Sequence, residues 1–161
     1  MRKEKTKEVL DAVDMSILRL LQQDGALSTP ALAEKLASSV TPCWRRLKRL
    51  EQEGYIKDYQ ANLDRKKLGM NVLAFVQLSF VAHADEAPNR FEQQIQAYPE
   101  ILSCHKVTGD ADYLIQVLVE DLDAYSHFVE NVLRKIDGIY KIQSSLALKE
   151  VKSGTRIPLP K

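Results

Sequence analysis

Residues 39–54 read Ser-Val-Thr-Pro-Cys-Trp-Arg-Arg-Leu-Lys-Arg-Leu-Glu-Gln-Glu-Gly. Pro42 fits the first turn of a helix, where a missing N–H costs nothing, and Gly54 fits the end of that helix. Ser39 or Thr41 is the candidate N-terminal cap. At about 100° per residue, one face of the helix collects the apolar side chains Cys43, Leu47 and Leu50.

This helix carries a cluster of cations, because Arg45, Arg46, Lys48 and Arg49 fall within five residues. Thr41, Arg45, Lys48 and Gln52 lie opposite the apolar face, with Arg49 and Trp44 at the flanks, so the basic cluster is predicted to face solvent. Arginine pairs bidentately with guanine edges in the major groove, and lysine neutralises phosphate, so a solvent-facing cluster of this kind suits duplex DNA. Arg45 and Thr41 are predicted to read bases, and Lys48 and Arg49 to contact phosphates. The alternative is an ordinary solvated helix face. The candidate DNA-binding residues are Ser39, Thr41, Trp44, Arg45, Lys48 and Arg49, of which Trp44 has a second possible role as a cover for the first helix.

Two shorter helical patterns precede this stretch. Asp11 is placed to cap a run whose apolar side is Val13, Ile17, Leu20 and Leu21, and Asp24-Gly25 ends that run. Thr29-Pro30 starts the second pattern, which buries Leu32, Ala33 and Leu36. Two short helices joined by a tight turn, the second of them basic, predict a helix-turn-helix. Residues 55–62 follow as a small extended wing, so residues 1–62 are assigned to a DNA-binding domain.

Residues 63–71 break the periodicity and carry three consecutive cations, which indicates an exposed linker. Beyond the linker, strand patterns at 72–81, 101–108, 113–119 and 140–151 alternate with helical patterns at 88–98 and 124–136. Two successive β-α-β units predict a ferredoxin-like βαββαβ domain over residues 72–161, with both helices on one sheet face. The whole chain is then an α+β protein. The proline-rich tail, residues 153–160, is expected to lack regular structure and to lie over a neighbouring subunit.

The face of this sheet that the helices leave bare also carries apolar residues. The even positions of 72–80 are all apolar, yet Phe75 and Val81 occupy odd positions, and Ile142, Leu146 and Leu148 share one side of the last strand. A sheet that is apolar on both faces needs a second cover, and a second copy of the chain is the economical one.

Composition excludes several classes of protein. The 161 residues carry 23 Lys and Arg against 22 Asp and Glu, so the net charge of +1 leaves no uniformly basic coat. Cys43 and Cys104 are too far apart for a disulfide framework or a zinc pair, and no signal peptide or membrane span is legible, so we expect a cytoplasmic protein. No metal site and no catalytic motif is expected, and therefore no enzyme activity and no cofactor.

The motifs in this order resemble those of the Lrp/AsnC, or feast/famine, transcription regulators over roughly residues 11–151. The first part of the resemblance is carried by Asp14, Ile17-Leu18, Leu21-Gln22-Gln23-Asp24-Gly25, Leu32-Ala33-Glu34, Thr41-Pro42-Cys43-Trp44-Arg45-Arg46-Leu47, Leu50-Glu51 and Gly54-Tyr55-Ile56. The second part is carried by Pro99-Glu100-Ile101, Thr108-Gly109-Asp110-Ala111-Asp112-Tyr113-Leu114 and Gln143-Ser144-Ser145-Leu146. One departure is the turn Ala37-Ser38-Ser39, where the family commonly has Gly-Leu-Ser, and Val40 is the candidate to fill the gap left by the leucine.

The resemblance implies a winged helix-turn-helix followed by a ligand-binding RAM domain that dimerises and often assembles into octamers. It also implies an amino-acid effector bound near the glycine loop, at interfaces between ligand domains. In chemical terms, Asp110 or Asp112 suits an ammonium group, while hydroxyl groups and loop N–H groups suit a carboxylate. The alternative is a plain hairpin. The candidate effector residues are Thr108, Gly109, Asp110, Asp112, Ser144 and Ser145.

The resulting prediction is a DNA-binding transcription regulator that is modulated by an amino acid and forms a homodimer that assembles into a homo-octamer. The competing hypothesis is a metabolite-sensing module whose helix-turn-helix binds a protein partner instead of DNA. The salt dependence of binding distinguishes the two hypotheses, because binding to several phosphates weakens steeply as the salt concentration rises.

Overall fold

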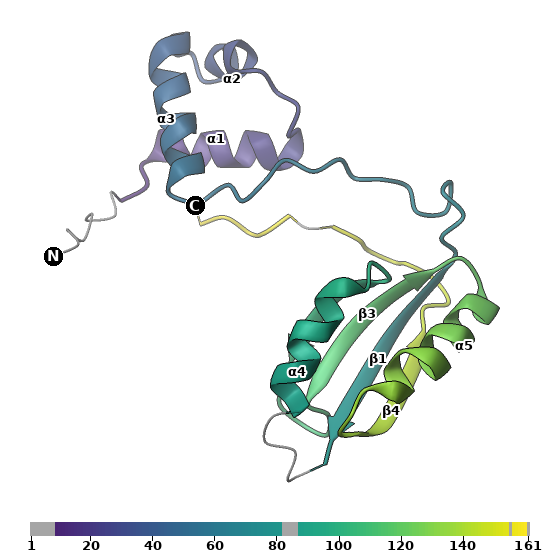
Figure 1. The fold of residues 1–161 in the computed structure, drawn as a ribbon. Coiled ribbons are helices and arrows are strands. Elements are labelled where there is room, and N and C mark those ends of the chain that lie inside the picture. Colours follow the sequence, from purple (N-terminus) through teal and green to yellow (C-terminus); the bar gives the residue numbers. More distant parts are fainter. Residues whose placement is uncertain (1–8, 82–86, 155, 161) are drawn as a thin grey trace, which may run out of the picture. The chain divides into compact units, whose positions relative to one another are not determined.

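The computed structural model describes residues 9–81, 87–154 and 156–160 of the chain. The first eight residues of the expected DNA-binding domain lie outside the described part, as do Thr155 and Lys161 of the tail. The chain divides into two compact units, drawn in Figure 1. The first unit runs to Asn62 and also takes in the segment from Gly154, and the second covers Leu63–Ser153. By this division, the tail from Gly154 is grouped with the first unit.

The first unit is built from three helices, α1 (Ala12–Gln23), α2 (Thr29–Lys35) and α3 (Val40–Gln52). Asp11 caps α1 as predicted, because its carboxylate accepts hydrogen bonds from the N–H groups of Val13 and Asp14. The Asp14 carboxylate accepts in return from the Asp11 N–H, which completes a capping box. Asp24 ends α1 at the expected place.

The turn between α2 and α3 differs in detail from the prediction. The hydroxyl of Ser28 caps α2, and Thr29 is the first helical residue. Ser39 precedes α3, but its side chain makes no capping hydrogen bond. Ala37 adopts a φ of 49°, a left-handed conformation that favours glycine. Val40 is 47% exposed, so the expectation that it fills the turn is wrong.

A small apolar core joins the three helices. Val13 was expected in this core but is 39% exposed at the solvent side of α1. After Gly54, whose φ is 77°, residues 55–62 form no strand, so the expected extended wing is irregular in the described structure. Tyr55 and Ile56 pack on the edge of the core instead. The fully or nearly buried members are Ile17, Leu32, Ala33, Cys43, Leu47 and Leu50.

The second unit is a four-stranded antiparallel sheet with two helices, as the ferredoxin-like prediction requires. Its strands are β1 (Val72–Phe80), β2 (Ile101–Lys106), β3 (Tyr113–Val119) and β4 (Ile139–Leu146), in the spatial order β2-β3-β1-β4. The predicted helix at 124–136 is α5 (Leu122–Asn131) followed by a 3-10 turn, Leu133–Lys135. The last strand stops at Leu146, five residues before the predicted end at Val151.

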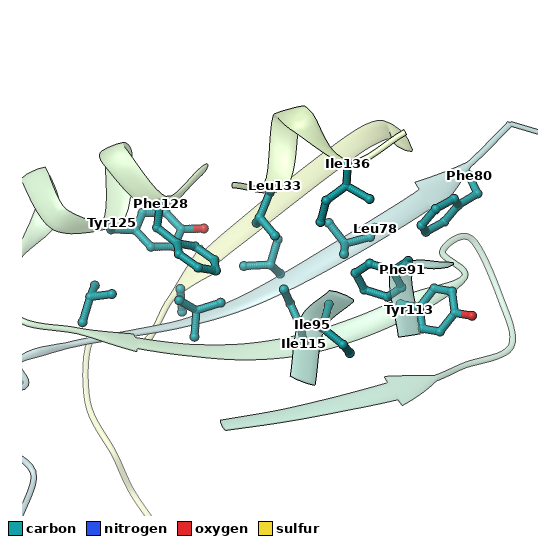
Figure 2. Packing of buried hydrophobic residues seen from close by; sticks show 14 of the residues in the cluster. Leu78, Phe80, Phe91, Ile95, Tyr113, Ile115, Tyr125, Phe128, Leu133 and Ile136 are labelled. Carbon is teal, nitrogen blue, oxygen red and sulfur yellow. The ribbon is translucent and has the colours of Figure 1, made fainter. Parts of the chain in front are cut away.

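Helices α4 (Ala87–Gln94) and α5 cover one face of this sheet (Figure 1). Figure 2 shows aromatic and aliphatic side chains from both helical segments lying over Leu78 and Ile115. The rings of Phe91 and Tyr113 meet edge to face at 4.8 Å between centroids. Among the described residues, no helix is both long enough and apolar enough to cross a membrane.

The other sheet face carries different apolar residues from those predicted, because the register places Leu73, Leu114 and Leu118 on it together with Phe75. The strand register pairs Leu78 with Ile142 and Ala74 with Leu146, so Ile142 and Leu146 share the helix-covered face and do not add to the bare one. Phe75 does lie on the bare face and is 38% exposed. Its neighbours on adjacent strands are polar, namely Gln116 on β3 and Ser145 on β4.

Candidate nucleic-acid interface and effector loop

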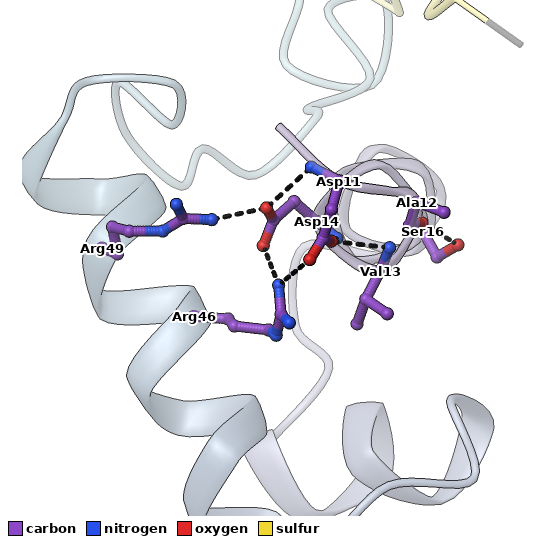
Figure 3. A network of polar contacts seen from close by, with 7 residues as sticks. All are labelled: Asp11, Ala12, Val13, Asp14, Ser16, Arg46 and Arg49. Atoms are coloured by element: carbon purple, nitrogen blue, oxygen red, sulfur yellow. Dashed lines mark hydrogen bonds and ion pairs between the residues drawn. The ribbon is translucent and has the colours of Figure 1, made fainter. Parts of the chain in front are cut away.

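Asp14 joins α1 to α3 through two arginines, as Figure 3 shows. Its side chain is only 1% exposed. Arg46 Nη1 lies 2.9 Å from Asp14 Oδ1 and 2.6 Å from Asp11 Oδ2, and Arg49 Nη2 donates to Asp14 Oδ2. One buried carboxylate therefore holds two of the four cations of α3 against α1.

Opposing effects act on the pKa of Asp14. Burial alone raises it, but hydrogen bonds from the Arg49 guanidinium, the Asp11 N–H and the Arg46 guanidinium together outweigh burial and keep the pKa below its ordinary value. The same contacts with Asp11 and Asp14 raise the pKa of Arg46. Asp14 and Arg46 therefore stay charged near neutral pH and interact as an ion pair.

This network corrects the prediction that the whole basic cluster faces solvent. Arg46 and Arg49 turn toward α1, so Arg49, predicted to bind phosphate, has its guanidinium engaged inside the domain. Lys48 Nζ is 2.6 Å from Glu51 Oε2. Arg45 is exposed, and among the described residues no hydrogen bond or ion pair engages it. Of the four cations, Arg45 is the one presented outward without a partner in the described structure.

Glu51 in turn is held by the segment that follows α3. The Tyr59 hydroxyl donates to Glu51 Oε1 at 3.0 Å. The hydrogen bond from Lys48 lowers the pKa of Glu51, and the Tyr59 hydroxyl adds to this effect against a contribution from burial. Burial and the bond to Glu51 raise the pKa of Tyr59 to about 12. Lys48, which was predicted to contact phosphate, is therefore paired with a negative charge that Tyr59 also holds.

The remaining DNA-binding candidates are accessible. Ser39 and Thr41 are exposed at the start of α3. Trp44 is 50% exposed, which leaves part of the residue accessible and is compatible with either of its two predicted roles. Thr41, Trp44 and Arg45 occupy the first half of α3 and Ser39 directly precedes it, where the free N–H groups of a helix N-terminus also favour phosphate.

The glycine loop between β2 and β3 is tied to the end of β1. Gly109 has a φ of 114°, which requires glycine. Asp112 accepts a 2.7 Å hydrogen bond from the Phe80 N–H through Oδ2, and its own N–H donates to the Leu78 carbonyl at 3.0 Å. Asp112 therefore anchors the loop, whereas Asp110 is exposed on it.

Ser144 and Ser145 do not join this loop within one chain. The Tyr125 hydroxyl donates to Ser144 Oγ at 2.5 Å, beneath α5 on the covered sheet face. Ser145 pairs with Phe75 in the register and so points to the bare face. Of the six effector candidates, the structure keeps Thr108, Gly109, Asp110 and Asp112 together and separates the two serines from them and from each other.

Asp14, Glu51 and Gln22 were not among the residues predicted to have a functional role. A signal for Asp14 was present, because a carboxylate three residues before Ile17 and seven before Leu21 lies on the apolar side of α1 and needs a partner. Lys48 three residues before Glu51 was a local signal for their ion pair, but the contact of Glu51 with Tyr59 comes from the segment that follows α3. No local pattern marks Gln22, whose partner Ile157 lies far along the chain.

Two family models together match most of the chain. Residues 10–57 match a winged helix-turn-helix DNA-binding domain, and residues 73–157 match the Lrp/AsnC ligand-binding domain. The chain belongs to the Lrp/AsnC family of transcription regulators. Membership explains the two-unit architecture, with a DNA-binding helix-turn-helix ahead of a ligand-binding sheet domain.

Several characterised members of the Lrp/AsnC family resemble the chain over nearly its full length. The Bkd operon transcriptional regulator of Pseudomonas aeruginosa is 43% identical and covers 93% of this chain and 98% of its own. The leucine-responsive regulatory protein of Escherichia coli K12 is 34% identical, with coverages of 92% and 90%. A transcriptional regulator of Neisseria meningitidis, solved as a complex with L-Met, is 39% identical with a TM-score of 0.89, and covers 93% of this chain and 97% of its own.

Proposed function

We propose that this regulator reads duplex DNA with the first half of α3 and that an amino acid bound at the glycine loop modulates the binding. The observation that best supports this DNA interface is the set of ion pairs that Asp14 makes with Arg46 and Arg49. It draws Arg46 and Arg49 inward and leaves Arg45 exposed beside Thr41. An exposed guanidinium on a rigidly held helix is suited to bidentate pairing with guanine.

The other residues of α3 take supporting roles in this proposal. Thr41 contacts a base edge beside Arg45, and Trp44 contributes apolar contact with the groove. Ser39, whose hydroxyl makes no capping bond, is available to a phosphate at the helix N-terminus. Lys48 contacts phosphate after it releases Glu51. Arg49 orients α3 through Asp14 instead of binding phosphate itself.

An α-amino acid is the effector that best fits the loop. Asp110 offers a carboxylate to the ammonium group, and Thr108 with the loop N–H groups faces the carboxylate. Asp112 holds the loop in place through Phe80. The leucine-responsive relative and the L-Met complex of the Neisseria protein support this class of ligand.

We further propose that the bare sheet face forms a homodimer, with octamers as the higher assembly. The exposed Phe75 lies on this face and is the natural centre of the contact. A two-fold dimer presents two α3 helices, so its operator is expected to contain half-sites about one helical turn apart, roughly 34–36 Å, or a multiple of that spacing.

Binding to a preferred duplex tests the DNA interface. We expect Arg45→Ala to cost about 1–3 kcal/mol, a loss of roughly 5- to 150-fold in affinity, and to blur sequence preference. Arg90→Ala, which removes an exposed arginine from α4 in the other unit, is the matched control and should bind like the parent. Unchanged binding by Arg45→Ala would overturn the assignment. A weak dependence of binding on salt would favour the alternative, a protein partner at the helix-turn-helix.

A further inference from the structure

The C-terminal segment lies along α1 in the first unit and is held mainly through backbone atoms. The side-chain amide of Gln22 makes two hydrogen bonds to one residue of the segment. Its Oε1 accepts from the Ile157 N–H at 2.7 Å, and its Nε2 donates to the Ile157 carbonyl at 3.2 Å. Gln22 thus pairs with Ile157 as the peptide group of a neighbouring strand would.

Two further contacts lie on either side of this pair. Arg19 Nη2 donates to the Pro160 carbonyl, and Arg156 Nη2 donates to the Gln23 carbonyl at 3.4 Å. Leu159 is half-buried and lines a hollow of about 210 Å³ beside Arg19. The segment is therefore bound at three points along one helix face.

The local sequence prepares the segment for this contact. Pro158 and Pro160 restrict the residues before them, Ile157 and Leu159, to extended conformations. An extended residue presents its N–H and its carbonyl toward the same side, which is the arrangement that a glutamine amide can pair with. The prolines also reduce the conformational entropy that the segment loses on docking.

The contact between the C-terminal segment and α1 adds to the ways in which the two units are connected. The chain leaves the first unit after Asn62, forms the second unit over Leu63–Ser153, and returns to the first unit at Gly154. A docked segment therefore gives the DNA-binding unit a second connection to the ligand-binding unit, in addition to the linker at 63–71. The four hydrogen bonds that hold its described residues are exposed to solvent, so docking is an equilibrium that modest changes can shift.

We propose that the face of α1 centred on Gln22 is a docking site for residues 156–160 of the same chain, and that the docked segment is a second tether that limits rotation of the DNA-binding unit. This site is separate from the α3 surface, and the inference does not depend on how α3 contacts DNA. It assigns the last residues of the chain to control of domain motion.

Two variants of the full chain separate docking from a general effect on α1. Gln22→Ala removes both hydrogen bonds to Ile157, whereas Gln23→Ala keeps the backbone carbonyl that Arg156 uses. Alanine is the best helix former, so neither change should unfold α1, and far-ultraviolet circular dichroism checks this. A third variant ends at Ser153 and lacks the segment altogether.

Hydrogen exchange and fluorescence report the two parts of the proposal. By mass spectrometry, the Ile157 N–H should exchange several-fold more slowly in the parent and in Gln23→Ala than in Gln22→Ala. Trp44 is the single tryptophan and lies in α3, so its time-resolved anisotropy follows motion of the DNA-binding unit. We expect the amplitude of the nanosecond component to rise at least twofold in Gln22→Ala and in the truncated chain, and not in Gln23→Ala.

Three results would overturn the proposal. Equal exchange at Ile157 in Gln22→Ala and the parent would mean that the segment does not dock there. An anisotropy decay unaffected by truncation would mean that the segment does not tether the unit. Protection of Ile157 that rises with protein concentration would mean that the segment comes from another copy.

Discussion

Replacing Asp14 with asparagine tests the contact that orients α3. The substitution keeps the size of the side chain but removes the negative charge that Arg46 and Arg49 share. It also turns one acceptor oxygen into an NH2 group that faces guanidinium donors. We expect α3 to lose its fixed position on α1 and the first unit to lose stability.

The magnitude follows from the burial of the three groups. Removing one partner of a buried ion pair costs about 3–5 kcal/mol, because the remaining charge is left unpaired. Here the Arg46 and Arg49 side chains are 34% and 24% exposed, so water can solvate them in part. The expected cost is therefore about 2–4 kcal/mol, against a total of roughly 3–9 kcal/mol for a unit of this size.

Urea unfolding followed by Trp44 fluorescence measures this effect, because the single tryptophan reports on the first unit. If the free energy of unfolding falls with urea by about 1 kcal/mol per M, as in small domains, the midpoint should fall by about 2–4 M. The matched control is Glu34→Gln, an exposed carboxylate on α2 that loses the same charge. A midpoint for Asp14→Asn within the error of the Glu34→Gln midpoint would refute the reasoning.

Four further outcomes are expected. Glu51→Gln should free Lys48 and raise affinity for all duplexes, with a log–log salt slope steeper by about 0.9 in anisotropy titrations. Ala37→Gly should raise the free energy of unfolding by about 0.5–1 kcal/mol in urea, because the left-handed φ strains alanine. Phe75→Arg should dissociate the dimer in light scattering. Asp14, whose pKa is lowered from 3.8, should contribute its full stability above about pH 4 and lose it as the pH falls through the lowered value, which acid titration of fluorescence measures.

Each of these outcomes has a contrary result. A sequence-specific loss of affinity in Glu51→Gln would mean that Glu51 reads a base and does not restrain Lys48. A less stable Ala37→Gly would mean that the turn tolerates its alanine without strain. A dimeric Phe75→Arg would place the interface elsewhere. Stability of the first unit that is unchanged well below the lowered pKa would mean that Asp14 is not the acid-sensitive group.

The order of helices and strands could be predicted because each depends on a pattern within about ten residues. The cap at Asp11, the stop after Asp24 and the alternation along β1 are local features of this kind. The ends of helices and strands were harder to predict. For example, β4 stops at Leu146 because its pairing with β1 ends there, opposite Ala74. The length of a strand depends on its partner as well as on its own residues.

The candidate site, too, could be predicted from the sequence only in part. The basic helix and its amphipathic faces were evident from residues 39–54 alone, but which cations face outward was not. Arg49 is drawn inward by an aspartate 35 residues earlier in the chain, and Lys48 is neutralised by an acid that a later tyrosine holds. Likewise Ser144 and Ser145, adjacent in sequence, lie on opposite faces of β4.

By itself, the sequence determined the family, the two-unit architecture and the identity of the basic helix, because periodicity, caps and motif order are properties of short segments. Only the tertiary structure decided which charges are free. An ion pair between Asp14 and Arg49 forms because folding brings distant segments within hydrogen-bonding distance and removes the carboxylate from water. The spacing of residues along the chain does not show this proximity. Arg45 can therefore be recognised as the exposed cation only when the structure shows that its neighbours are paired.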